Sequence, residues 1–309
     1  MQPLNSYDID FKKTPGVTLR VEPSSNALRS FVPNYRVLDF DTTPGVESSN
    51  WLLSNLGTLW ILLTPEPIEF VIGNRSYAMP GPIVLVGVMS RAMVVKHQRG
   101  IAVVVDIGPL AWARLFLPSA EHLRDRVTLV DQLLPSGWSE DLVPRLVRCN
   151  RGAAVKTVID DFFSERIPPA HQFEETLSRI ATFMRDETRR DLANAAVSAG
   201  ISGQDLLRLS KRYFGFPPKT MMIRTRFMRA MTDILVNNGN PDFSANPAGY
   251  HDVRHFLRDA DRFLGMTPRR FLKLIQPNLR ASMRAGIQAA DTIQFETEMS
   301  ISIDYANSP

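Results

Sequence analysis

Basic side chains are concentrated in the stretch GYHDVRHFLRDADRFLGMTPRRF (249–271), which holds seven Arg or His residues in twenty-three. Guanidinium groups bind anions, above all phosphate, and an arginine can also bind the edge of guanine through two hydrogen bonds. Between these cations, apolar residues recur at helical spacing: Val253, Phe256, Ala260 and Phe263. The stretch therefore predicts a helix with one apolar face and one strongly basic face.

The sequence offers no arrangement of residues that is typical of catalysis. No pair of carboxylates stands out as acid and base. The single cysteine, Cys149, excludes an internal disulfide and makes a cysteine-based zinc site improbable. His255 is expected to be a partly buried structural residue on the face opposite Asp252. The other histidines lack the spacing of metal ligands: His97, His122, His171 and His251. We therefore expect no enzyme, no metal and no cofactor.

The positive charge of the chain lies in one block. Residues 1–187 hold 19 Lys or Arg against 21 Asp or Glu, and residues 291–309 hold four acids and no base. Residues 188–290, in contrast, hold 17 Lys or Arg against 7 acids. Such a block is typical of proteins that bind a polyanion, although it would also suit a membrane surface or an acidic protein.

The first third of the chain has the pattern of strands. Short β-branched or aromatic runs separated by Gly- and Pro-containing turns predict an antiparallel small barrel or sandwich. Trp51, Trp60 and Phe70 could line a ligand pocket there, but core packing is the better interpretation. The runs are VTLRV (17–21), YRVLDF (35–40), TLWILL (58–63), IEFVIG (68–73), PIVLVGV (82–88), AMVVK (92–96) and IAVVVD (101–106).

After residue 109 the pattern becomes helical, so the fold class is α+β. Segments 110–117 and 120–127 predict short helices, and 139–166 predicts further helix. RIPPAHQ (166–172) is expected to be a linker, because paired prolines cannot continue a helix. The first residues contain no apolar run, and the longest apolar stretch, 51–63, is too short to span a bilayer. We therefore expect a cytoplasmic protein that does not enter a membrane.

A second copy of the opening stretch lies fifty residues earlier, GISGQDLLRLSKRYFGFPPKTM (200–221). In both copies a helix-capping residue precedes a basic helix, a glycine ends it, and a proline begins the next helix. A further helix over 188–200 and a turn at Gly200 complete a helix-turn-helix pattern, whose second helix enters the DNA major groove. The matching pairs are Ser202 and Asp252, Leu206 and Phe256, Leu207 and Leu257, Arg208 and Arg258, Arg212 and Arg262, Tyr213 and Phe263, Gly215 and Gly265, and Pro218 and Pro268.

One long helix is predicted between the copies, over 219–238. About nineteen residues at about 1.5 Å each give a rod of about 28 Å. Successive major grooves on one face of DNA lie about 34 Å apart. The predicted rod could therefore hold two reading helices in adjacent grooves.

This two-motif block of about a hundred residues resembles the DNA-binding domain of the AraC/XylS family of bacterial transcription regulators. Segment 101–135 is also similar, more weakly, to the end of an N-terminal sensor domain in some of these proteins. The residues that carry the main likeness are Ser202, Leu206, Arg208, Gly215, Pro218, Arg226 and Ala230, and then Gly249, Tyr250, Asp252, His255, Phe256, Arg258, Phe263, Gly265, Thr267, Pro268 and Phe271.

The chain departs from the family pattern at several positions. Ser210 and Ala260 stand where members usually carry an aromatic residue, which predicts looser packing of both reading helices. Asp261 takes a place that is normally basic, which should weaken phosphate contact there. Pro241 could begin the first helix of the second motif, whereas Pro247 must end or kink it.

The resemblance, together with helix geometry, assigns expected roles to the exposed residues. Side chains near the start of each reading helix should face base edges: Gln204, Leu207 and Arg208 in the first, and Val253, Arg254 and Arg258 in the second. Arg208 and Arg258 could instead be structural, since they recur at one place in both copies. Other cations are expected to contact phosphates or simply to be solvated: Lys211, Arg212, Lys219, Arg262, Arg269 and Arg270.

The resemblance also implies a division of the chain. We expect a β-rich sensor or dimerisation domain over 1–135, a helical linker over 136–170, a DNA-binding domain over 171–288 with motifs at 188–214 and 241–264, and a polar tail over 289–309. Promoter DNA is the implied partner, with RNA polymerase, a small effector and a second copy of the chain as further ones. Two other functions stay open: a small β-domain enzyme or ligand-binding protein with a helical appendage, and a nonspecific architectural DNA binder.

Overall fold

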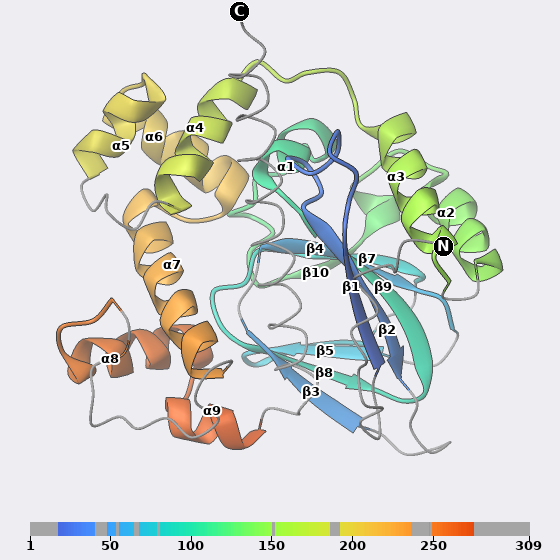
Figure 1. Cartoon of the computed structure of the whole chain (residues 1–309), viewed down its shortest axis with the longest axis horizontal. Helices are drawn as coiled ribbons and strands as arrows, with labels where there is room; N and C mark the ends of the chain where they lie inside the picture. The colour runs from blue at the N-terminus through green and yellow to red at the C-terminus, as the bar shows by residue number, and fades with distance from the viewer. Residues whose placement is uncertain are drawn as a thin grey trace, which may run out of the picture.

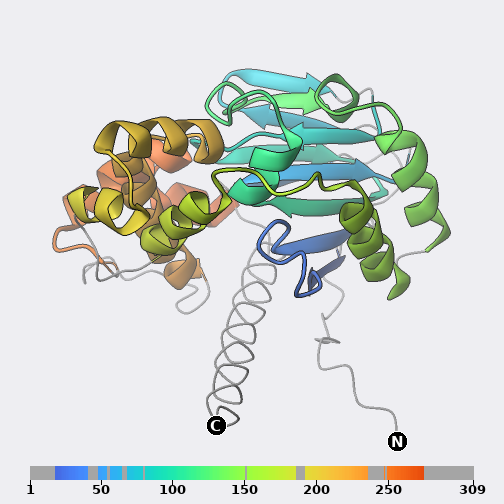
Figure 2. The same cartoon turned by 90° about the horizontal axis from the view of Figure 1, so that it is seen from above.

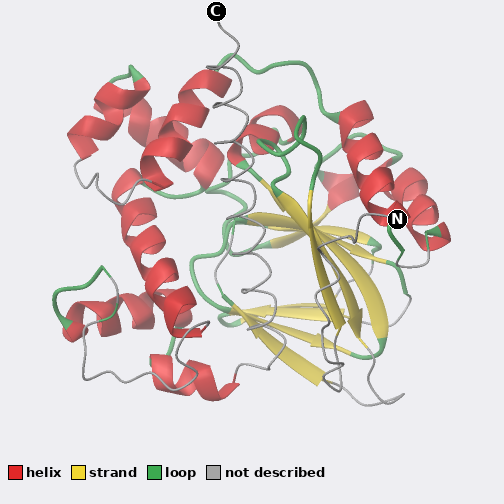
Figure 3. Ribbon diagram, in the orientation of Figure 1, coloured by secondary structure: helices red, strands yellow, loops and turns green. Residues whose placement is uncertain are grey.

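The structure is a computed structural model of the 309-residue chain. It describes residues 18–40, 48–53, 56–64, 68–78, 81–149, 152–185, 192–235, 247 and 249–274. Two β-sheets form its centre, helices α2 and α3 lie on one side of them, and helices α4 to α9 lie on the other (Figures 1 and 2). Colouring by secondary structure separates the strands from the helical half of the chain (Figure 3).

Every strand pairing is antiparallel. One sheet has six strands in the order β1 (Thr18–Pro23), β2 (Asn34–Phe40), β9 (Gly100–Ile107), β4 (Gly57–Leu62), β7 (Ile83–Val86) and β10 (Val127–Leu129). The other has four, in the order β3 (Ser48–Leu52), β8 (Met93–His97), β5 (Ile68–Ile72) and β6 (Arg75–Ala78). The α+β class and the antiparallel sheets are confirmed. Within the described residues the sheets do not close into a barrel.

Strands β4 and β7 are buried on both faces, which explains their unbroken apolar sequences. Trp60 and Val84 point into an apolar cluster shared with the four-stranded sheet. Leu59 and Leu85, one residue along, belong to a second cluster that continues into the helices. Trp60 meets Phe70 edge to face, with ring centroids 5.0 Å apart, so core packing is confirmed for these two aromatic residues.

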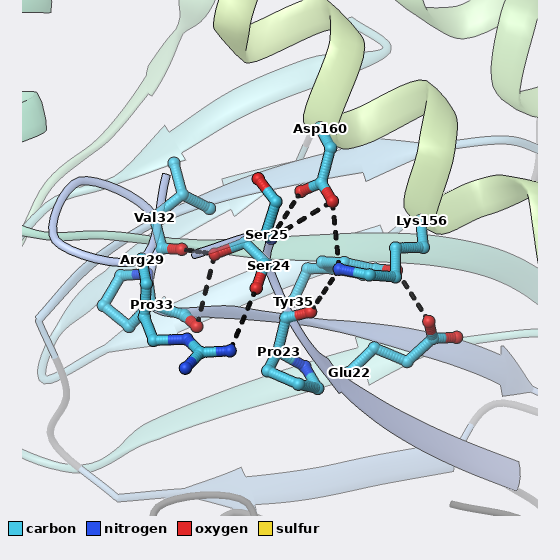
Figure 4. Close-up of polar contacts among 10 residues, drawn as sticks. All are labelled: Glu22, Pro23, Ser24, Ser25, Arg29, Val32, Pro33, Tyr35, Lys156 and Asp160. Atoms are coloured by element: carbon cyan, nitrogen blue, oxygen red, sulfur yellow. Dashed lines mark hydrogen bonds and ion pairs between the residues drawn. The ribbon is translucent and has the colours of Figure 1, made fainter. Parts of the chain in front are cut away.

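Three helices lie between strand β9 and the predicted linker at 166–172: α1 (Pro109–Leu115), α2 (Trp138–Arg148) and α3 (Ala154–Arg166). A polar network joins α3 to the sheet edge (Figure 4). Asp160 accepts a hydrogen bond from the backbone N–H of Ser25, and Lys156 Nζ donates to Asp160 at 2.9 Å and to the carbonyl of Pro23 at 2.7 Å. The network fixes α3 against the start of the β region.

The helix predicted over 120–127 is wrong. This segment forms turns and then strand β10, which pairs with β7. Asp125 has a left-handed backbone, with φ of 56°, and its carboxylate accepts hydrogen bonds at 2.6 Å from the N–H and the hydroxyl of Ser90. These tertiary contacts outweigh the local helical pattern. Strands β3 and β6 went unpredicted because SSNWL and RSYA lack a run of β-branched residues.

From α4 onwards the described residues are mainly helical. The elements are α4 (Glu174–Arg185), α5 (Leu192–Ala199), α6 (Gly203–Leu209), the π-helical turn η2 (Ser210–Phe214), α7 (Pro218–Asp233), α8 (Val253–Leu264) and α9 (Pro268–Leu274). Helix α7 has 16 residues, which span about 24 Å, and the last residues of the predicted helix, 236–238, lie outside the described residues. The predicted first helix of the second motif and the polar tail lie outside the described residues. None of the helices that the structure describes is long and apolar enough to cross a membrane.

Candidate nucleic-acid interface

The first helix-turn-helix motif has the local structure that its sequence predicts. Gly200 turns the chain after α5 with φ of 68°. Ser202 caps α6 by accepting a hydrogen bond from the Asp205 N–H at 3.1 Å, and its hydroxyl donates to the Asp205 carboxylate at 2.8 Å. Hydrogen bonds from Ser202 and then from Arg208 lower the pKa of Asp205. The helix ends at Gly215, which is left-handed with φ of 78°.

Helix α8 repeats this frame in the second motif. The Asp252 side chain accepts from the Arg254 N–H at 2.8 Å, and Gly265 ends the helix with φ of 71°. The apolar face predicted for the helix is buried: Phe256, Ala260 and Phe263. They pack against Phe227 of α7, whose ring stacks on that of Phe263 at 5.3 Å.

A polar triad at the margin of this apolar face also holds α8 on α7. The Asp259 carboxylate accepts from the Tyr250 hydroxyl at 2.7 Å and pairs with Arg226 at 2.9 Å, while the Arg226 guanidinium lies 4.4 Å from the Tyr250 ring centre. Burial raises the pKa of Tyr250, so it remains a hydrogen-bond donor. Pro247 precedes this triad, and its carbonyl accepts from the Tyr250 N–H at 3.0 Å.

The expectation for His255 is wrong. Its side chain is exposed, and Nδ1 lies 3.9 Å from the Asp252 carboxylate. Residues three apart on a helix share one face, so His255 lies beside the capping residue rather than opposite it. Within the described residues, no group of three or more His, Cys, Asp or Glu is arranged to hold a metal ion.

Five of the six residues predicted to read bases are exposed, and Val253 is half-buried. Gln204, Leu207 and Arg208 come from α6, and Arg254 and Arg258 from α8. Among the predicted phosphate contacts, Lys211 is half-buried and the others are exposed: Arg212, Lys219, Arg262, Arg269 and Arg270. The helices that carry the predicted base readers, α6 and α8, lie at opposite ends of α7 (Figure 1).

Some of these cations already have partners within the protein. Arg208 pairs with Asp205 at 3.0 Å, and its guanidinium lies 5.5 Å from the Phe173 ring centre. Arg212 donates to the Tyr213 hydroxyl at 3.2 Å. Arg262 of α8 donates to Thr220 of α7 at 3.2 Å. Arg208 therefore has a local structural role, whatever else it binds.

The first reading helix consists of α6 and η2, and the loop over 118–126 binds its end. Sequence analysis missed this contact. The last carbonyls of a helix lack partners within it. Here the carbonyls of Arg212 and Lys211 accept from the backbone N–H groups of Ala120, at 2.7 Å, and Glu121, at 3.2 Å. The Lys211 ammonium also lies 3.3 Å from the Glu121 carboxylate. We call these contacts the loop clamp.

Arg124 completes the loop clamp by donating to the carbonyl of Gly215 at 2.9 Å. The signal for the clamp is weak in the sequence, because segment 120–127 reads as a helix with solvated charges. Its partners lie about ninety residues apart along the chain.

The second motif also rests on the β region. Leu53 and Ala92 belong to the apolar cluster that holds α7, α8 and α9 together. Trp51 meets Phe271 of α9 edge to face, with centroids 6.3 Å apart. Trp51 therefore packs between the four-stranded sheet and helix α9. The sequence pattern did not predict this contact with a helix. Helix α4 is anchored as well, since Arg114 of α1 forms a two-pronged ion pair with Glu174.

Comparison with known proteins agrees with the repeat. A family model described as a helix-turn-helix domain matches residues 195–274, which include both reading helices. No curated protein sequence matches the chain.

Some solved structures are similar over most of the chain. ToxT from Vibrio cholerae has a TM-score of 0.46 and 11% identity, over 84% of this chain and 99% of that one. ToxT from the same organism with bound unsaturated fatty acid has a TM-score of 0.42 and 12% identity, over 85% and 97%. The AraC-like transcriptional activator CuxR has a TM-score of 0.26 and 11% identity, over 71% and 88%.

TM-scores this low carry no argument about function. The match to the helix-turn-helix model is supported instead by the structure of the two motifs. Residues 195–274 hold two capped helices of the predicted frame, each ended by a left-handed glycine and followed by a helix that begins at proline. Residues 195–274 of the chain thus form a helix-turn-helix domain that resembles the DNA-binding domain of AraC/XylS-type transcription regulators.

Proposed function

We propose that the chain is a sequence-specific transcription regulator whose two helix-turn-helix motifs read adjacent major-groove segments of a promoter. The observation that carries this proposal is the pair of capped helices, α6 and α8, each with an exposed set of polar and basic side chains near its start. Helix α7 separates them by about 24 Å of helix, and the turns at both of its ends add to this distance.

Reading and positioning fall to different side chains in this proposal. Gln204, Leu207, Arg208, Arg254 and Arg258 meet base edges, and the half-buried Val253 supports the start of α8. The exposed cations hold the phosphate backbone and carry no sequence information. Lys211 reaches phosphate only when the DNA competes with Glu121 for its ammonium group.

The β region controls the orientation of both motifs. The division into a sensor domain over 1–135, a linker over 136–170 and a DNA-binding domain over 171–288 is part of the proposal. A small molecule bound to the β region would act through the loop clamp and the Trp51 contact, because these join it to the first and second motif. Helices α2 and α3 lie on the side away from the reading helices, so a second copy docked there would leave the DNA face open (Figure 2).

The test is selection of binding sites from a random duplex pool by the full chain, followed by titration of the selected site against scrambled DNA at two salt concentrations. The full chain is needed because one apolar core joins α4, α5 and α6 to the β region. We expect a motif of two half-sites about one helical turn apart, preferred over random DNA by roughly a thousandfold.

Two alanine variants separate base reading from general affinity. Arg254→Ala should relax one half-site and leave the other intact, whereas Arg270→Ala should weaken every sequence alike and lower the salt slope by about one. Binding that is uniform across sequences and that collapses steeply with salt would replace this proposal by the architectural one. Turnover of a substrate with no DNA binding would favour the enzyme.

A further inference from the structure

The two reading helices present their side chains in one common frame. Each begins after a residue whose side chain caps it, Ser202 or Asp252, and each ends at a left-handed glycine, Gly215 or Gly265. Both intervals are 13 residues long. Over the α-helical residues 203–209 and 253–259, residues fifty apart in the chain therefore occupy equivalent helical positions, and a base contact made by one has a counterpart in the other.

Two neighbouring positions of this frame carry the same residues in both helices. Leu207 and Leu257 are each 43% exposed, so both apolar side chains reach the surface beside the exposed cations of their helices. They are followed by Arg208 and Arg258, both exposed. An exposed apolar side chain in the major groove suits the thymine methyl group, and arginine suits guanine. Leu257, which sequence analysis did not assign, thus belongs with Leu207.

One exposed position near the helix start differs between the copies. Gln204 of α6 corresponds to Arg254 of α8. Both side chains are exposed, and neither has a side-chain partner within the described residues. Glutamine pairs through two hydrogen bonds with adenine, whereas arginine pairs with guanine. The two helices therefore present the same Leu-Arg pair to the DNA but differ at the exposed position nearer the helix start, Gln204 or Arg254. We call this position the first reader.

The copies also follow one another head to tail. Each reading helix is followed by a glycine and then by a helix that begins at proline, α7 at Pro218 and α9 at Pro268. Copies that enter successive grooves on one DNA face with the same helix direction read the same strand in the same direction.

We infer that the chain recognises an imperfect direct repeat, with half-sites about 10 to 10.5 base pairs apart. The half-sites share the bases read by Leu207-Arg208 and Leu257-Arg258. They differ at the base read by the first position, which is adenine opposite Gln204 and guanine opposite Arg254. This inference rests on the proposed function and names the DNA sequence class that it recognises.

The test exchanges the two first readers. Binding sites are selected from a random duplex pool by the full-length wild type, Gln204→Arg, Arg254→Gln and the double exchange. The wild type should select adenine in the first half-site and guanine at the same place in the second. Gln204→Arg should give guanine in both, Arg254→Gln adenine in both, and the double exchange should reverse the wild-type order.

Each altered base should change binding of a fixed duplex by roughly 5- to 150-fold. Lys219→Ala serves as the control. A lost phosphate contact should weaken binding equally to the duplexes selected by the wild type and by the three exchange variants. Circular dichroism of every variant checks that the helices are folded, which the exposure of both positions favours.

The outcomes separate this inference from the proposed function. If the folded wild type selects no motif, both the proposed function and the inference fail. If it selects two half-sites that share no bases, or if the exchanges leave the selected bases unchanged, the chain is a specific regulator but not a reader of a direct repeat.

Discussion

Replacing Gly215 by alanine should test whether the loop clamp holds the first motif. Gly215 has φ of 78°, and an added Cβ would lie 3.2 Å from Val88 Cβ and 3.3 Å from the carbonyl oxygen of Ala120. Gly265 is the matched control, since it ends α8 in the same conformation, φ 71°, with nothing within 4 Å of an added Cβ.

The magnitudes follow from these two environments. A left-handed alanine costs about 1–2 kcal/mol, and this cost applies to both variants. Crowding of a packed contact adds about 1–3 kcal/mol, and this applies only to Gly215→Ala. We therefore expect Gly215→Ala to lower the free energy of unfolding by about 1–3 kcal/mol more than Gly265→Ala does.

The assay is denaturant unfolding of the full chain, followed by circular dichroism, for the wild type and both variants. The crowding arises between residues of the β region and of the first motif, which lie far apart in the chain. Equal losses of stability in the two variants would refute the reasoning, because they would mean that the loop does not press on Gly215.

Three further predictions concern single side chains. Ser210 is fully buried, and its hydroxyl has no hydrogen-bond partner within the described residues. Ser210→Ala should therefore raise the free energy of unfolding by about 1 kcal/mol. A lower free energy of unfolding in chemical denaturation would show that the hydroxyl is satisfied. The hydrogen bond from Arg114 lowers the pKa of Glu174, so this carboxylate stabilises the fold fully above its unfolded pKa of about 4.3 and less as the pH falls through its folded value. Glu174→Gln should cost about 1–3 kcal/mol at pH 7 and less as the pH falls below the folded pKa of Glu174, and a loss independent of pH in unfolding titrations would contradict this. Glu121→Gln should free the Lys211 ammonium group from its ion pair. DNA affinity should then rise by up to about fivefold at low salt and by less at high salt. Unchanged affinity in DNA titrations at both salt concentrations would mean that Lys211 does not bind phosphate.

Ser210 and Ala260, where the chain departs from the family pattern, are both fully buried. Polar contacts hold the reading helices close to these two residues. The triad of Tyr250, Asp259 and Arg226 ties α8 to α7, and the loop clamp ties the end of the first reading helix to the β region. Looser packing of the two helices stays a prediction.

Local patterns made several elements predictable. The caps at Ser202 and Asp252 and the stops at Gly215 and Gly265 depend on residues within one helical turn, so their types alone predicted them. The apolar series of α8 predicted its buried face for the same reason. Strand β10 was missed because its formation depends on pairing with β7, a partner about forty residues away.

The antiparallel β region, the capped basic helices and their repetition follow from the sequence alone, because each is encoded in neighbouring residues. The places where the helices pack depend on the complete fold. The contacts of Ala120 with Arg212, of Arg114 with Glu174 and of Trp51 with Phe271 join segments that no periodicity relates. Such contacts form when the chain brings distant surfaces together, and here they attach the helices of both motifs to the β region.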